Sequence, residues 1–191
     1  MDLFAVTKAA ESMLVALGCD LTDENLKDTP ERIAKMFCNE LAANSEKKFN
    51  GDIIKVFPND KKYDEIILLD NIPFTSICSH HFITFQGLAW LLYLPDKKLI
   101  GASKPARIID FFSKKPQLQE NLGIEVMDAF EKYVEPKGCM LYMRATHGCM
   151  SSRGVKTGLN AGMSTCITRG VFRTSPELEL KGLQLIQLSK Q

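Results

Sequence analysis

Residues 83–94 read ITFQGLAWLLYL and contain the densest apolar run of the chain, from Leu88 to Leu94. The β-branched and aromatic residues of this segment, bounded by turn residues, predict a β-strand. Three other segments have the same character: DEIILLDNI at 64–72, CMLYMRATH at 139–147 and MSTCITRGVF at 163–172. The apolar run is far too short to span a bilayer, so we expect no membrane partner.

Helices are predicted between the second and third strands and after the fourth. One begins at Ser103, with Pro105 in its first turn, and covers 106–115; the next follows Pro116 and covers 117–134. A last helix starts near Pro176. This order of elements predicts an α+β fold, in which helices pack on one face of an antiparallel sheet.

The region before the strands is predicted to be helical. Residues 4–17 have apolar positions at helical spacing and stop at Gly18, and a second helix runs from Asp28-Thr29-Pro30 towards Ala43. Residues 44–62 are polar and are predicted to form a loop. We therefore expect an N-terminal helical segment at 1–50 and a second domain at 51–191.

Charge and composition narrow the class of protein. A formal net charge of +1 over 191 residues argues against a dedicated nucleic-acid binder, which needs a surplus of Lys and Arg. The N-terminus has neither a basic n-region nor a long apolar h-region, so we expect a cytoplasmic protein. Without a secretory context, the irregularly spaced cysteines are predicted to be free thiols or metal ligands; four are assigned to the core: Cys19, Cys38, Cys139 and Cys166.

All three histidines lie beside cysteines, in Cys78-Ser79-His80-His81 and in His147-Gly148-Cys149. Cys78 and His81 offer two zinc ligands from one turn, and Cys149 can supply a third, which leaves a fourth position for water. His80 and His147 are then candidates for proton transfer. The alternatives are a chance cluster, since short Cys/His motifs arise without metal, and a packing role for either spare histidine.

Cations at a predicted helix start indicate an anion site. Lys104 and Arg107 follow Gly101-Ala102-Ser103, where free backbone N–H groups and positive side chains favour a phosphorylated small molecule. Arg153 lies four residues past Cys149 and would bring a guanidinium near the metal. Glu120 is a candidate carboxylate, although an acid near a helix N-terminus is also a common stabilising feature.

Five segments, in this order and at these spacings, resemble the GTP cyclohydrolase I family. They are Thr29-Pro30-Glu31-Arg32-Ile33-Ala34-Lys35-Met36, Cys78-x-His80-His81, Gly101-x-Ser103-Lys104-x-x-Arg107-Ile108, Gln117-x-Gln119-Glu120-x-Leu122 and Ala145-Thr146-His147-x-Cys149-Met150-x-x-Arg153-Gly154. The resemblance covers nearly the whole chain from about Leu21. It implies a tunnelling fold, in which antiparallel strands of several subunits close into a barrel with helices outside. It also implies a homodecamer of two stacked pentamers with active sites at subunit interfaces.

The resemblance further implies a reaction, in which GTP and water give 7,8-dihydroneopterin triphosphate and formate after attack at C8 of the purine. Cys78, His81 and Cys149 match the Zn²⁺ ligands, His147 the main acid–base histidine that protonates N7, and His80 a second one. Glu120, with Gln119, matches the guanine anchor. The ribose-triphosphate contacts are matched by Ser103, Lys104, Arg107 and Arg153, joined from a neighbouring subunit by Arg32 and Lys35.

One residue departs from the pattern, because the family usually has Cys-Glu-His-His and this chain has Ser79 in place of the glutamate. The change removes a charge beside the metal motif and leaves open a different substrate, such as dGTP, or a non-catalytic purine-nucleotide-binding homologue. A deazaguanine nitrile reductase of the same fold is disfavoured, since it would need a nucleophilic cysteine and a nicotinamide site rather than zinc.

Overall fold

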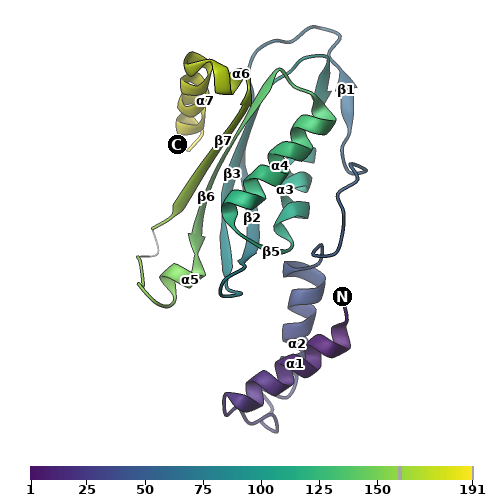
Figure 1. Cartoon of the computed structure of the whole chain (residues 1–191), viewed down its shortest axis with the longest axis vertical. Helices are drawn as coiled ribbons and strands as arrows, with labels where there is room; N and C mark the ends of the chain where they lie inside the picture. Colours follow the sequence, from purple (N-terminus) through teal and green to yellow (C-terminus); the bar gives the residue numbers. More distant parts are fainter. Residues whose placement is uncertain (159–160, 191) are drawn as a thin grey trace.

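The computed structural model describes residues 1–158 and 161–190, which are built around a five-stranded sheet in the order β5-β2-β3-β6-β7 (Figure 1). The four predicted strands are confirmed as β2 (Ile67–Cys78), β3 (Thr84–Leu94), β6 (Gly138–His147) and β7 (Met163–Gly170), paired antiparallel. The prediction of a wholly antiparallel sheet was wrong, because β5 (Pro116–Gln117) pairs parallel to β2. The observed sheet is therefore mixed.

Two helices cover one face of this sheet, α3 (Lys104–Ser113) and α4 (Gln119–Val134) (Figure 1). Both predicted helices are thus confirmed, α4 with a start two residues later. Their apolar stripe packs on side chains that alternate along the strands, such as Ala89, Leu91 and Tyr93 of β3. The larger core of the protein lies between these helices and the sheet.

The opposite face is covered in part by the C-terminal helices α6 (Val171–Thr174) and α7 (Pro176–Leu188). Trp90, Leu92 and Met140 point to this side and form a second core cluster with Phe172 and Ile186. The prediction that the helices pack on one face was therefore wrong for α7. The covering of both faces also explains the apolar run at 88–94, because a strand that is buried on both faces does not alternate between apolar and polar residues.

The N-terminal helices extend beyond one end of the sheet (Figure 1). The first predicted helix is confirmed as α1 (Leu3–Ala16), whereas the second divides into α2 (Thr29–Lys35) and a π-helical turn, η1 (Met36–Leu41). The boundary at 50/51 stays a prediction.

Some short elements were not predicted. Val56–Pro58 form β1, which pairs with β4 (Lys98–Ile100), so the prediction of loop throughout 44–62 was wrong. The short helix α5 (Gly148–Ser151) directly follows β6. These elements are only three to four residues long, and a pattern needs more residues than that to show a period.

None of the six cysteines, all of which lie in the described residues, forms a disulfide, which agrees with the prediction of free thiols or metal ligands. Cys139 is buried in the core, where burial raises the pKa of its thiol to about 12. Cys19 and Cys38 are only partly buried, and Cys166 is exposed on β7, so its placement in the core was wrong. In the ranges that the structure covers, no helix has the length and hydropathy needed to cross a bilayer.

Gly87 marks a close approach of β3 to β6, and we expect it to tolerate no side chain. A Cβ at this position would collide with the main-chain carbonyl oxygen of Arg144 and lie 2.6 Å from the Cα of Ala145. Because backbone atoms cannot move aside cheaply, Gly87→Ala is expected to lower the free energy of unfolding by about 1–3 kcal/mol or more. Denaturant unfolding followed by circular dichroism measures this change.

Gly158→Ala is the matched control for this prediction. A Cβ at Gly158 would have no described heavy atom within 4 Å, and we expect its unfolding midpoint to stay at the wild-type value. Equal midpoints for the Gly87→Ala variant and the wild type would contradict the close approach of the two strands.

Candidate metal centre and its surroundings

Cys78, His81 and Cys149 form one group at the end of the sheet. Their sulfur and imidazole nitrogen atoms all lie within 4.8 Å of one another. Cys78 is the last residue of β2, and Cys149 lies in α5, directly after β6. Because β2 and β6 both pair antiparallel with β3, their C-terminal ends lie at the same end of the sheet.

The turn that carries His81 is closed by main-chain hydrogen bonds. The N–H of Cys78 donates to the carbonyl of Ile83, and the N–H of Phe82 donates to the carbonyl of Cys78, both at 2.9 Å. Ser79 donates its N–H to the carbonyl of Gln117 on β5 at 3.2 Å, which attaches the turn to the neighbouring strand. Phe82 has a φ of 54°, a conformation that bulky residues rarely adopt. The turn is thereby held with His81 beside both cysteines.

The group fits zinc. Tetrahedral zinc bonds of about 2.0–2.3 Å place the ligand atoms about 3.3–3.8 Å from one another. The three atoms here lie within 4.8 Å of one another, so small side-chain movements suffice. Two sulfurs and one imidazole are ligands that zinc prefers, and three protein ligands leave one position open. Burial, and after it the contact with Cys78, raises the pKa of the Cys149 thiol. A bound cation reverses that effect, because it stabilises the thiolate form.

His147 lies beside this group, at the end of β6, and is held on two sides. Its ring stacks on Phe85, with centroids 4.7 Å apart and planes 2° from parallel. Its Nε2 is 2.9 Å from Oε1 of Gln119, the first residue of α4. Burial lowers the pKa of His147, and the nearby Glu120 carboxylate partly offsets this effect. A histidine so held can exchange a proton in a fixed direction.

Glu120 and Arg153 also come to this end of the sheet. Glu120 is exposed in the first turn of α4, close enough to His147 to influence its pKa. Arg153 is exposed after α5 and lies near Cys149, where its positive charge favours the thiolate. The His80 ring is 6.3 Å from the ring of the ligand His81. Eight predicted site residues thus surround the metal group or form it: Cys78, His80, His81, Gln119, Glu120, His147, Cys149 and Arg153.

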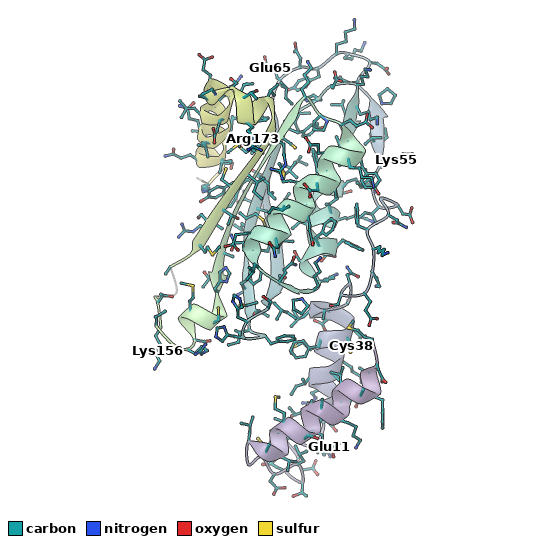
Figure 2. The ribbon with its side chains drawn as sticks, viewed as in Figure 1. Glu11, Cys38, Lys55, Glu65, Lys156 and Arg173 are labelled. Carbon is teal, nitrogen blue, oxygen red and sulfur yellow. The ribbon has the colours of Figure 1, made fainter. Side chains whose placement is uncertain are left out.

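The predicted triphosphate contacts Ser103, Lys104 and Arg107 are not brought to this end within one chain. They lie at the start of α3, where Gly101 donates its N–H to the carbonyl of Lys55 at 2.9 Å. The other end of α3 lies near β5 and the metal group. With ten residues, the helix separates its start from its end by about 15 Å. Figure 2 shows Lys55 at the upper right of the molecule and Lys156, which follows Arg153 by three residues, at the lower left of the sheet.

Arg32 and Lys35 lie on the N-terminal helix α2, outside the sheet domain. Both are exposed and pair with acids on the same helix turn: Arg32 with Asp28 at 3.3 Å and Lys35 with Glu31 at 2.7 Å. Ion pairs this exposed contribute little and exchange readily for another anion. The two side chains are therefore exposed and only weakly held within the chain.

Two residues at the site were not identified from the sequence. Phe85 is fully buried and supports the His147 ring, but an aromatic residue in an apolar strand is indistinguishable from ordinary core. Thr165 on β7 hydrogen-bonds to Gln119 at 3.1 Å, and only the pairing of β6 with β7 brings it there.

The fold and the site define an α+β protein with a Cys-His-Cys zinc-type centre at the edge of its sheet. A family model described as GTP cyclohydrolase I matches residues 6–187, and the chain belongs to the GTP cyclohydrolase I family. GTP cyclohydrolase 1 of Thermoanaerobacter pseudethanolicus is 39% identical over 191 residues and is covered completely, as is this chain. GTP cyclohydrolase 1 of Finegoldia magna is 36% identical over 188 residues, which cover 98% of this chain and 100% of that protein.

A solved structure, the apo form of the archaeosine synthase QueF-Like, matches with a TM-score of 0.45 and 11% identity. The match covers 55% of this chain and 93% of that one.

Proposed function

We propose that the chain is a zinc-dependent GTP cyclohydrolase I, which hydrolyses GTP at C8, releases formate and forms 7,8-dihydroneopterin triphosphate. The observation that carries this proposal is the three-ligand group, with His147 and Glu120 beside it at one end of the sheet. When bound, zinc makes a water molecule nucleophilic near neutral pH.

The residues around the group have the chemistry that a guanine nucleotide needs. Guanine presents N1–H and an amino group on the same edge, and the exposed Glu120 carboxylate can accept both hydrogen bonds. Adenine has no N1–H and would leave this carboxylate partly unpaired, so Glu120 favours guanine. His147 then lies where it can deliver a proton to the imidazole half of the purine, with His80 as a second proton carrier.

The triphosphate site is proposed to require more than one subunit. Ser103, Lys104 and Arg107 lie at the far end of α3 from the metal group of the same chain, yet they bring two cations to a helix start, where the helix dipole favours an anion. A second copy would place its α3 start against the first copy's metal group, beside Arg153, with Arg32 and Lys35 from a neighbouring arm. We therefore propose an oligomeric barrel of tunnelling-fold subunits, a decamer of two pentamers, with sites at the interfaces.

The experiment is a turnover assay on protein whose zinc content is measured in the same sample. GTP is expected to release formate and to give a product that becomes a fluorescent pterin on oxidation. Neither product at full zinc occupancy would contradict the proposal. Because Ser79 removes an acid beside His80, dGTP is assayed in parallel. Faster turnover of dGTP would show an altered substrate, and nucleotide binding without turnover would favour a non-catalytic homologue.

A further inference from the structure

Gln119 lies in the first turn of α4 next to Glu120, but its side chain has the opposite environment. Glu120 is exposed, whereas Gln119 is fully buried, with 0% of its surface exposed. Within the described residues, the Gln119 amide hydrogen-bonds with groups of β6 and β7. Two adjacent residues of one motif therefore point to different places, Glu120 to the surface and Gln119 into the protein.

The orientation of the Gln119 amide follows from its partners. Its nitrogen is 3.4 Å from the carbonyl oxygen of Met143, 3.3 Å from that of Met163 and 3.1 Å from the hydroxyl of Thr165. Main-chain carbonyls only accept hydrogen bonds, so the NH₂ group must face them. A flipped amide would set its oxygen against two carbonyl oxygens, which is repulsive. Oε1 of Gln119 is thereby turned to His147.

The orientation of Gln119 in turn determines where the proton of His147 lies. Oε1 can only accept, and it is 2.9 Å from Nε2 of His147, so Nε2 carries the proton in the neutral ring. Nδ1 is then the ring nitrogen left to take up and return a proton. A 180° flip of the ring would keep the parallel stack on Phe85 but would place Cε1 where Nε2 lies and so lose this hydrogen bond.

We propose that Gln119 is a positioning residue, which holds His147 in the Nε2–H tautomer and does not contact the substrate with its side chain. This inference rests on the proposed function for its kinetic consequence, but the tautomer itself does not depend on turnover. The hydrogen bond to the Gln119 oxygen and the stack on Phe85 together fix which ring nitrogen carries the proton and where the other one points.

The test uses Gln119→Met, which keeps the shape of the side chain and removes its hydrogen bonds. We expect kcat for GTP to fall about 10- to 100-fold, because His147 is no longer held in one tautomer and orientation, with KM changed less than twofold. Gln119→Glu keeps an oxygen towards Nε2 and, with its carboxyl protonated, a donor towards the carbonyls of Met143 and Met163, so it is expected to restore part of kcat. Thr165→Val is the matched control, since it removes one partner of the amide nitrogen and leaves the His147 bond in place.

A second readout reports the tautomer without any turnover. The chain has only three histidines, so solid-state NMR of zinc-loaded, ¹⁵N-histidine-labelled protein can resolve them, with His80→Gln used for assignment. His147 is expected to show a protonated Nε2 and an unprotonated Nδ1 in the wild type and in Thr165→Val. In Gln119→Met, the signals are expected to change to a mixture of tautomers or to Nδ1–H.

Opposite results would overturn the proposal. An unprotonated Nε2 in the wild type, or an unchanged tautomer in Gln119→Met, contradicts it whether or not the protein turns over GTP. A rise in KM with kcat unchanged would show that Gln119 binds the substrate instead. If the wild type shows the expected tautomer but no formate release, the proposed function fails while the positioning role stands.

Discussion

Replacement of Cys149 by alanine is expected to remove zinc from the protein and to lower GTP turnover by about 1000-fold or more. The variant leaves two protein ligands, Cys78 and His81, where a catalytic zinc site uses three. The metal supplies several kcal/mol of charge stabilisation to a hydrolytic transition state, and each 1.4 kcal/mol is a factor of ten in rate. The loss of one ligand should therefore affect both metal content and rate.

Metal analysis after dialysis, together with formate release, measures both effects on one preparation. Cys166→Ala is the matched control, because Cys166 is an exposed thiol on β7 outside the metal group. We expect this control to keep one zinc per chain and the wild-type rate. Stoichiometric zinc in Cys149→Ala would show that the third ligand has been assigned wrongly.

Replacement of His147 by alanine is expected to have the second largest effect, with a different signature. Zinc should stay bound, since none of its ligands is changed, while kcat falls about 100- to 10,000-fold through the loss of a proton-transfer group. The variant also leaves Oε1 of Gln119 without its 2.9 Å partner and removes the ring that stacks on Phe85. We therefore expect a loss of stability of about 1–3 kcal/mol as well.

Thermal unfolding separates the two effects of the His147→Ala change. Turnover is compared at a temperature where the variant is still folded, and zinc is measured in the same sample. Phe85→Leu is the control for packing: it removes the aromatic stack but keeps the imidazole, so its stability should fall with a smaller loss of kcat. Loss of zinc in His147→Ala would mean that the histidine has been assigned the wrong role.

The long elements of the fold were predictable because their own residues carry the signal. The strand at 83–94 and the helices after Ser103 and Pro116 have apolar patterns that need no knowledge of their partners. The covering of the second face by α7 and the parallel pairing of β5 could not be predicted. Both depend on contacts between residues far apart in the chain, such as the packing of Ile186 in the cluster with Met140 and the pairing of Cys78 with Gln117.

The candidate metal ligands could be found early for a chemical reason. Cysteine and histidine are few in this chain, and their clustering around positions 78–81 and 147–149 limits the partners that each could have. The same reasoning could not separate Gln119 from Glu120, because neighbouring polar residues at a helix start look alike in a sequence. Burial distinguishes them, and burial is set by how α4 lies across β6 and β7.

The sequence by itself determined the α+β class, the four long strands, the metal-binding residue types and the resemblance that the family match later confirmed. Only the tertiary structure decided which side chains meet. It brought Cys78 close to Cys149, because β2 and β6 both pair with β3. It also placed His147 between Phe85 and Gln119, and it separated the start of α3 from the metal group. The physical reason is range: propensity and periodicity act within a few residues, whereas a site is assembled by hydrogen-bonded strands whose partners lie about 70 residues apart, as Cys78 and Cys149 do.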